Sequence, residues 1–189
     1  NGGMITSCYT TGTVIGNAYV VGGLVGDNNS TIASCYATGS VIGNAAVGGL
    51  VGDNDGTIIF CYATGAVSGT SSVGGLMGVN YSGGVSSFWD TQASRQTTSA
   101  GGTGKTTLEM KRQSTFAAAG WDFTGVWEIT DNQSYPHLRV FQRQATPSAD
   151  LNGDGRVDLA DFALFAQSWN TRFGQAGFLA VAIASGILV

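Results

Sequence analysis

The sequence predicts a mainly β protein: a parallel β-solenoid of about three coils of 26 or 27 residues with a capping segment, then a small loop-and-helix module. A glycine-rich pentapeptide returns at a fixed spacing, and the residues between its copies favour strands. Near the C-terminus, an acidic pattern precedes an amphipathic run. These features divide the chain into repeats (1–90), a solenoid-closing segment (91–145), the loop and helix (146–172) and an apolar tail (173–189).

The pentapeptide recurs through the first half of the chain. It reads GGLVG from Gly22 and from Gly48, and GGLMG from Gly74, so the repeat has a constant period of 26. The intervening residues are mainly Gly, Thr, Val, Ile, Tyr and Asn, which favour strands and turns over helices. Each repeat therefore predicts one coil of a parallel β-solenoid, stacked about 4.8 Å above the previous coil.

A second motif runs out of phase with the first. CYTTG begins at Cys8, and CYATG begins at Cys35 and Cys61, so the first spacing is longer than the second by one position. Stacking places the three thiols one above another. We expect free, inward-pointing cysteines, because in-register parallel strands hold neighbouring thiols poorly for a disulfide. The pair Phe88-Trp89 is expected to fill the Cys-Tyr position of the next coil.

Asparagines form a further row at the same period. Asn28, Asn54 and Asn80 each follow a copy of the pentapeptide and stand where the chain is expected to turn. Amide side chains that stack in register can hydrogen-bond from one coil to the next. We therefore expect this row to be structural.

The segment after the repeats is expected to close the solenoid. Residues 91–107 are rich in Thr, Ser, Gln and Gly and predict an exposed connection, and residues 107–119 predict one short helix capped by Thr107. The apolar residues that follow predict strands covering the open end, where an uncovered edge would pair with other chains. Packing is the expected role of these aromatic rings, and stacking of Trp121 or Trp127 on sugars is the alternative.

Composition excludes several functions. The chain has 8 basic and 12 acidic residues and a net charge of −4, so it lacks the electrostatic footprint of a nucleic-acid-binding protein. Three cysteines are an odd number and exclude a closed disulfide framework. The single histidine, His137, severely limits histidine-based catalysis. We therefore expect no enzymatic activity in this chain.

Residues 150–161, DLNGDGRVDLAD, carry the clearest chemistry in the chain. Oxygen-bearing side chains stand at loop positions 1, 3, 5, 9 and 12, and position 7 offers a backbone carbonyl; the candidate ligands are Asp150, Asn152, Asp154, Arg156 (by its carbonyl), Asp158 and Asp161. Gly155 at position 6 allows the sharp bend. This is the ligand order of an EF-hand-type loop, because Ca²⁺ takes about six to eight oxygen ligands. A solvated acidic turn is the alternative.

An amphipathic run follows the loop. Phe162, Phe165, Ala166 and Trp169 recur at i, i+3, i+4 and i+7, which predicts a helix with one apolar face. Loop position 12 is Asp161 instead of the Glu of a standard EF-hand, and the shorter side chain reaches less far toward an ion.

The run DLNGDGRVDLADFALFAQSW resembles one half of a type I dockerin, the calcium-loop-and-helix module of bacterial extracellular assemblies. The resemblance implies calcium binding and a cohesin-like partner, and dockerins often attach polysaccharide-degrading enzymes to a scaffold. Dockerins carry two such halves, and this chain has one. An apolar run from Phe178 to Val189 stands where the second is expected.

The GGLVG repeats with their CYATG partners resemble the GLUG motif of bacterial surface proteins. That motif occurs in adhesin-like repeat regions and beside the peptidase domains of some immunoglobulin A proteases. The stretch from Phe88 to Leu138 is similar to the segment that closes such repeat regions. The resemblance implies an extracellular or cell-surface bacterial protein and supplies no catalytic residue.

The two ends of the chain carry weaker signals. Residue 1 is Asn and not Met, so we expect a C-terminal fragment or a processed product. Residues 176–189 form an apolar stretch of 14, shorter than the roughly 20 that a membrane-spanning helix needs. We expect a helix packed on the calcium loop or an aberrant end of the reading frame; the chain contacts a membrane only if this tail is an anchor.

The function that these features predict is binding. We expect a non-catalytic secreted or cell-surface protein whose solenoid is a stalk or an adhesive surface for a glycan or protein ligand. Its calcium loop would order the following helix for docking. The alternative is an accessory C-terminal region of a larger extracellular polysaccharide-degrading hydrolase or peptidase.

Overall fold

The computed structural model describes residues 1–17, 19–82, 84–142 and 151–173. The chain divides into two compact units, residues 1–140 and 141–189. The first unit holds a parallel β-solenoid, and the main described element of the second is helix α3 (Leu159–Phe173). None of the helices in the described ranges has the length and apolarity that a membrane crossing requires.

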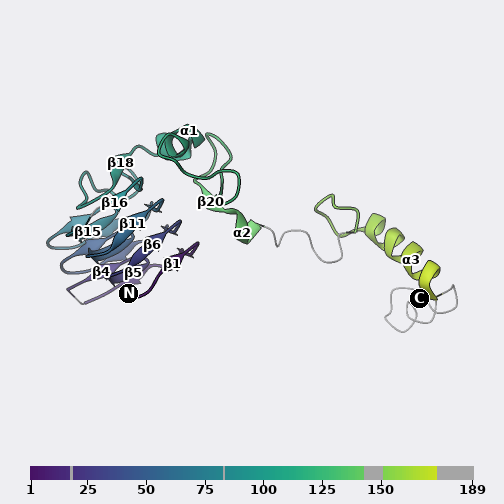
Figure 1. Ribbon diagram of the computed structural model, residues 1–189, viewed down its shortest axis with the longest axis horizontal. Helices are drawn as coiled ribbons and strands as arrows, with labels where there is room; N and C mark the ends of the chain where they lie inside the picture. The colour runs from purple at the N-terminus through teal and green to yellow at the C-terminus, as the bar shows by residue number, and fades with distance from the viewer. Residues whose placement is uncertain (18, 83, 143–150, 174–189) are drawn as a thin grey trace. The chain divides into compact units, whose positions relative to one another are not determined.

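Each full coil of the solenoid contains five short strands, and equivalent strands of successive coils pair in parallel (Figure 1). The first sheet contains β1 (Ile5–Thr6), β6 (Thr31–Ala33), β11 (Thr57–Ile59) and β16 (Gly84–Val85). The second contains β2 (Tyr9–Thr10), β7 (Tyr36–Ala37), β12 (Tyr62–Ala63), β17 (Phe88–Asp90) and β18 (Thr103–Lys105). The third contains β3 (Val14–Ile15), β8 (Val41–Ile42) and β13 (Val67–Ser68). The fourth contains β4 (Val21–Gly22), β9 (Val47–Gly48) and β14 (Val73–Gly74), and the fifth β5 (Val25–Asn28), β10 (Val51–Asn54) and β15 (Met77–Asn80).

The register follows the sequence repeat. Tyr9 lies opposite Tyr36, and Tyr36 opposite Tyr62, so the longer first spacing of the Cys-Tyr motif is accommodated without a shift in pairing. Rows of like side chains fill the interior, and Ile32 and Ile58 are both fully buried. The predicted parallel β-solenoid of about three coils is confirmed.

The GGLVG motif marks the place where two backbones touch. A Cβ atom on Gly48 would lie 1.8 Å from the carbonyl oxygen of Val51, and one on Gly52 would lie 2.7 Å from the amide nitrogen of Val21. Backbone atoms cannot move aside as the end of a flexible side chain can. The glycines therefore let the fourth sheet pack directly against the fifth, with no room for a side chain at these positions.

The thiol row forms as predicted in the middle of the stack. The amide of Cys8 donates to Sγ of Cys35 (3.4 Å), and the amide of Cys35 donates to Sγ of Cys61 (3.4 Å). All three cysteines are free, which confirms the expected thiols; Cys35 and Cys61 are buried, whereas Cys8 is exposed. Burial raises the pKa of the Cys61 thiol above its usual range, so it stays protonated and inert.

The fourth coil continues this row with a different residue. The amide of Cys61 donates to Oγ of Ser87 (3.1 Å), while Phe88 pairs with Tyr62 and Trp89 with Ala63. The prediction that Phe88-Trp89 fills the Cys-Tyr position is wrong by one residue. The register continues at the same period and brings a small polar side chain into the row.

The asparagine row is confirmed and is longer than predicted. Nδ2 of Asn28 donates to Oδ1 of Asn54 (2.7 Å), and Nδ2 of Asn54 donates to Oδ1 of Asn80 (2.8 Å). Asn1 extends the row, because its Nδ2 donates to Oδ1 of Asn28 (2.8 Å). Asn28 and Asn54 are fully buried, so these bonds satisfy amides that water cannot reach.

Residues 94–100 close the C-terminal end of the stack. The amide of Val67 donates to the carbonyl of Ser94 (3.0 Å), and the amide of Gly75 donates to the carbonyl of Thr98 (3.0 Å). Oγ of Ser99 accepts from the backbone amides of Leu76 (3.1 Å) and Met77 (2.9 Å). The exposed connection predicted for residues 91–107 is therefore wrong in part: the segment satisfies edge strands of the third, fourth and fifth sheets.

Two short helical segments replace the single helix predicted for residues 107–119. They are a 3₁₀ helix at Glu109–Lys111 and α1 (Gln113–Ala117), separated by Arg112 in an extended conformation. The 3₁₀ helix begins at Glu109, and the predicted cap by Thr107 is wrong. The amide and hydroxyl of Thr106 both donate to Oε2 of Glu109 (2.8 and 2.7 Å), and Oγ1 of Thr106 accepts from the Glu109 amide.

An aromatic cluster packs on the side of the stack. Its buried members are Tyr62, Phe88, Met110, Phe116, Trp121, Trp127 and Leu138. The antiparallel pair β19 (Trp127–Glu128) and β20 (His137–Leu138) carries part of the cluster, and α2 (Arg139–Gln142) follows. Because Tyr62 and Phe88 belong to the second sheet, the predicted cover of the open end is wrong. The cluster covers a lateral face, and residues 94–100 close the end.

Candidate functional site

The predicted calcium ligands lie before and within the first turn of α3. Asp150 lies outside the described residues, and the other five candidates lie within them. Gly153 and Gly155 have φ angles of +76° and +85°, the left-handed region that glycine enters without strain. The loop therefore bends at two glycines, one of them at the predicted position 6.

Asp161 is the organising side chain of this loop, and its exposed fraction is 2%. Oδ1 accepts from the amides of Leu151 (2.7 Å) and Asn152 (3.1 Å), and Oδ2 accepts from the amide of Asp158 (2.9 Å). These donors hold the pKa of Asp161 below its usual value, the Asp158 amide contributing most. The position-12 carboxylate is thus ionised and turned back into the loop.

The other oxygen side chains each accept from an amide two residues further on. Oδ1 of Asn152 accepts from Asp154 (2.9 Å), Oδ1 of Asp154 from Arg156 (2.9 Å), and Oδ1 of Asp158 from Ala160 (2.8 Å). Within residues 151–173 and the rest of the described chain, no three acidic, cysteine or histidine side chains gather as a metal centre. The donors are carboxylate, amide and carbonyl oxygens, which suit a hard cation such as Ca²⁺.

The amphipathic run predicted after the loop corresponds to α3. Phe162 and Ala166 are half-buried, whereas Leu159 and Phe165 have exposed fractions of 84% and 39%. The side chain of Trp169 lies outside what the structure describes. The helix therefore carries apolar side chains at its surface, close in sequence to the acidic loop.

A buried carboxylate that the sequence reasoning missed joins the last coil to the aromatic cluster. Asp90 is fully buried, and its Oδ1 accepts from the amides of Gln92 and Ala93 (both 2.9 Å) and from Oγ1 of Thr107 (3.0 Å). Its Oδ2 accepts from the Tyr135 hydroxyl (2.7 Å). Burial and then the carboxylate raise the pKa of Tyr135, which keeps that donor protonated. The signal was an aspartate placed directly after the apolar pair Phe88-Trp89.

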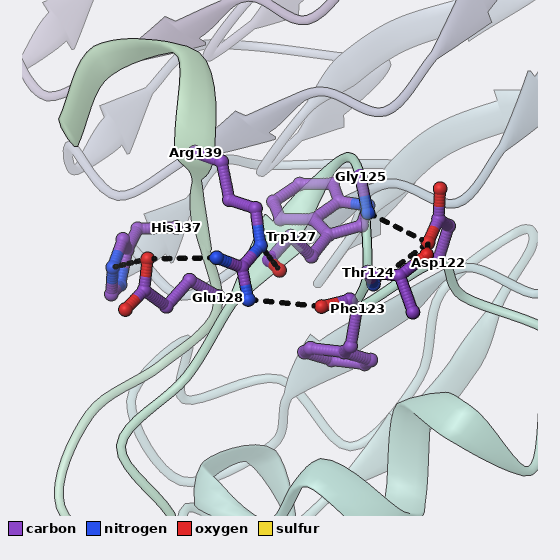
Figure 2. A network of polar contacts seen from close by, with 8 residues as sticks. All are labelled: Asp122, Phe123, Thr124, Gly125, Trp127, Glu128, His137 and Arg139. Atoms are coloured by element: carbon purple, nitrogen blue, oxygen red, sulfur yellow. Dashed lines mark hydrogen bonds and ion pairs between the residues drawn. The ribbon is translucent and has the colours of Figure 1, made fainter. Parts of the chain in front are cut away.

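The single histidine lies in a polar network at the edge of the aromatic cluster (Figure 2). Nε2 of His137 lies 3.9 Å from Oε2 of Glu128, and Nη1 of Arg139 lies 3.5 Å from the same oxygen. Arg139 also donates to the carbonyls of Trp127 (2.8 Å) and Phe123 (2.9 Å). These contacts fasten β19 and the loop before it to β20 and to the first residue of α2, so the network serves the fold.

The two tryptophans considered for sugar stacking are inside the cluster. Trp121 and Trp127 have exposed fractions of 4% and 1%, and Nε1 of Trp121 donates to the carbonyl of Ser86 (2.7 Å). Packing accounts for both rings. The apolar side chains that do face outward include a pair in the third sheet, where Ile15 (72% exposed) lies opposite Ile42 (43% exposed).

Comparison with known proteins agrees with the repeat. The family model of the GLUG motif matches residues 17–42, within the first two coils. A protein of Evansella cellulosilytica, whose name provisionally describes it as a Gly-rich membrane protein, is 38% identical in an alignment over 109 residues, and the match covers 49% of this chain. The chain spans 12% of that relative's length. No solved structure matches.

The first unit is therefore a β-solenoid with a match to the GLUG motif at residues 17–42, and the chain is similar to part of a longer protein. The GLUG match lies in the coils, and the dockerin resemblance of residues 150–161 gains no support from these comparisons.

Proposed function

We propose that the chain is a non-catalytic secreted or cell-surface protein in which the solenoid serves as a stalk and a binding surface. The in-register stack carries this proposal, because each added coil lengthens the body by about 4.8 Å and repeats its outward rows. The exposed pair Ile15 and Ile42 offers an apolar row to a protein or glycan ligand. The name of the relative, a Gly-rich membrane protein, favours a place at the cell surface.

Protease treatment of intact cells that produce the protein tests its location. The solenoid epitope should disappear from intact cells at the rate of a known surface protein, while a cytosolic marker survives. Survival of the epitope in intact cells, with digestion after lysis, would place the protein inside the cell and contradict the proposal.

We further propose that the loop at 150–161 binds Ca²⁺ and orders α3 for a cohesin-like partner. The ligands would be the side chains of Asp150, Asn152, Asp154, Asp158 and Asp161 and the carbonyl of Arg156. Support comes from the oxygen-only donor set, the two glycine bends and the inward carboxylate of Asp161. A bound cation would offset the repulsion among four carboxylates in 12 positions.

Calorimetric titration of the full chain with Ca²⁺, alongside helix content by circular dichroism, tests the calcium site. One saturable site is expected, and Asp150→Ala and Asp154→Ala should each abolish it. Asp55→Ala, an exposed aspartate of the solenoid, is the matched control and should leave the heat unchanged. Absence of heat and of any gain in helix content would leave function to the solenoid alone.

An accessory role in a longer hydrolase or peptidase is the second candidate. The observation in its favour is that the chain spans 12% of its relative's length, which leaves room for other domains in such proteins. In both cases the purified chain should not hydrolyse peptides, glycosides or ATP. A turnover that survives further purification would contradict the non-catalytic assignment.

A further inference from the structure

Four asparagines of the chain are followed two residues later by serine or threonine, with no proline between them: Asn28, Asn29, Asn80 and Asn132. In exported proteins this triplet is the acceptor motif for an asparagine-linked glycan. The motif alone does not distinguish the four copies. The structure does distinguish them, because the glycan is attached to the side-chain nitrogen Nδ2, which must be free of packed neighbours.

Two of the four side-chain nitrogens lie inside the stack. Asn28 is fully buried, and its Nδ2 donates to Oδ1 of Asn54 (2.7 Å) and to a backbone carbonyl of its own turn (3.0 Å), which uses both hydrogens. Nδ2 of Asn80 donates to the carbonyl of Ala100 (3.5 Å), and a Cβ atom built on Gly101 would lie 3.1 Å from it. A glycan on either nitrogen would displace a packed neighbour.

Asn29 is exposed at the turn between β5 and β6. The register of the asparagine row, one residue earlier, places Asp55 and Tyr81 at the same corner of the next two coils. Both are exposed, and the exposed fraction of Tyr81 is 74%. This corner therefore points away from the body in successive coils and has room for a substituent as large as a phenol ring.

The exposure of Asn29 does not come from an end of the stack. Its backbone amide donates to the carbonyl of Asn1 (2.9 Å), and the amide of Asp55 donates to the carbonyl of Asn28 (2.8 Å), so a coil lies on each side of the turn. Nδ2 of Asn29 donates to Oδ1 of Asp27 (2.8 Å), another exposed side chain. An amide nitrogen has two hydrogens, and the one left after glycan attachment can keep this bond. The glycan would therefore leave the local fold unchanged.

The fourth triplet, at Asn132, is exposed but is engaged in a tight turn. Asn132 has a φ angle of +61°, and its backbone amide donates to the carbonyl of Lys111 (2.7 Å). The hydroxyl of Ser134, the third residue of the triplet, accepts from the amide of Thr130 (2.9 Å). The motif depends on that hydroxyl, so recognition of this triplet would require the turn to open.

We propose that Asn29 is the acceptor of an asparagine-linked glycan. The donor class is an oligosaccharide joined through a diphosphate to a lipid. Nδ2 forms a bond to the anomeric carbon of the first sugar and gives up one proton. The bond between that carbon and the diphosphate oxygen breaks, and the lipid diphosphate leaves with the electron pair. The inference rests on the proposed location outside the cell, because the transfer acts on exported chains.

A reaction with purified components tests the acceptor independently of where the protein is located. The folded full chain is incubated with a lipid-linked oligosaccharide and an oligosaccharyltransferase chosen because it glycosylates the free peptide of residues 25–33 at Asn29. Mass spectrometry should find one glycan on the full chain, on the peptide that contains Asn29. A full chain that stays unmodified at Asn29, or that carries its glycan on another triplet, would overturn the proposal.

Substitutions assign the added mass to the triplet. Asn29→Gln and Thr31→Ala should each abolish it, because the first removes the acceptor nitrogen and the second the hydroxyl of the motif. Asn132→Gln, at the other exposed triplet, is the matched control and should leave the added mass unchanged. Circular dichroism shows that each variant is folded. A glycan that persists in Asn29→Gln would contradict the assignment.

The protein isolated from cells that produce it separates this inference from the proposed location. Chain at the cell surface with a glycan on Asn29, lost in Asn29→Gln, is the expected result. Chain at the surface with an unmodified Asn29 would overturn the glycan and leave the location standing. Chain found inside the cell would overturn both.

Discussion

Two rows of side chains lie next to each other on β5, β10 and β15, and repetition affects them in opposite ways. The asparagine row (Asn28, Asn54 and Asn80) forms side-chain amide hydrogen bonds from coil to coil, at 2.7 and 2.8 Å. One residue earlier on the same strands, Asp27 lies opposite Asp53, and Val79 takes the place in the third coil. Strand, register and spacing are the same for both rows.

The aspartate row is unfavourable where the asparagine row is favourable. Burial, and after it the carboxylates of Asp55 and Asp27, raises the pKa of Asp53 above its usual value. Within the described part of the chain, the buried Oδ1 of Asp53 has no hydrogen-bond partner. An amide both donates and accepts, so identical amides pair when stacked, whereas ionised carboxylates only accept and repel. In a solenoid, a residue repeated at the same position therefore stabilises or destabilises the folded state once in every coil.

The largest effect is expected from disrupting the close backbone contact at the GGLVG glycines, which packs the fourth sheet against the fifth sheet that carries both rows. In Gly52→Ala the new Cβ would lie 2.7 Å from the Val21 amide nitrogen and 2.8 Å from the carbonyl oxygens of Ala46 and Gly26. Because three backbone groups must shift, we expect a loss of at least about 3 kcal/mol in the free energy of unfolding, measured by urea denaturation.

Gly12→Ala is the matched control for this change. No atom lies within 4 Å of a Cβ built at Gly12, so its free energy of unfolding should stay within about 0.5 kcal/mol of the wild type. Equal losses in the two variants would show that the fourth and fifth sheets are not in direct backbone contact.

The second largest effect is expected in the asparagine row itself. Asn54→Leu leaves the side-chain amide of the fully buried Asn28 without its acceptor in this row, and Oδ1 of the half-buried Asn80 without its donor from Asn54. We expect a loss of about 2–4 kcal/mol in the free energy of unfolding, measured by urea denaturation. The control Asn29→Ala removes an exposed bond to Asp27 and should cost under about 0.5 kcal/mol. A loss no larger than the control's would mean that the row is incidental.

These rows could be predicted from the sequence because they depend on the repeat alone. Once the period of the repeat is known, Asn28, Asn54 and Asn80 must lie on one line, and so must the cysteines. The one-residue error at Phe88 arose because the aromatic pair was matched by size, whereas the register continued at the period of the preceding coils.

The closure of the stack could not be predicted in the same way. Residues 94–100 close it with backbone groups and the hydroxyl of Ser99, and such bonds leave no hydrophobic period in the sequence. The aromatic residues around Trp121 do carry a strong signal, but it indicates burial without indicating which face they cover. In the loop at 150–161, spacing predicted the bend at Gly155, while the turn of Asp161 toward backbone amides is a property of the folded loop.

A smaller effect of opposite sign is expected in the aspartate row. Asp53→Asn removes the charge opposite Asp27 and supplies a donor, so it should raise the free energy of unfolding by about 1 kcal/mol at neutral pH. The pKa of Asp53 is raised above the value of about 3.9 in an unfolded chain, so the wild type loses stability as the pH rises through the folded-state pKa.

The advantage of Asp53→Asn should therefore be absent below about pH 4 and complete at neutral pH. Denaturation midpoints of both proteins across this range measure it, with Asp131→Asn, an exposed aspartate outside the coils, as the control. An advantage that is the same at all pH values would mean that charge is not its cause.

The smallest effect is expected in a third row, in which the same strained backbone conformation recurs in every coil. Ser7, Ser34, Phe60 and Ser86 hold φ angles of 52° to 55° at the same corner of successive coils, a region that favours glycine. Ser34→Gly should relieve this strain by more than the added flexibility of glycine costs, which gives a net gain of about 0.5 kcal/mol in the free energy of unfolding. Ser40→Gly, at a position without positive φ in the same coil, should lose a similar amount. Urea denaturation of both variants measures this contrast. A loss in Ser34→Gly would show that the hydrogen bond from its amide to the Ile59 carbonyl depends on the serine holding this corner rigid.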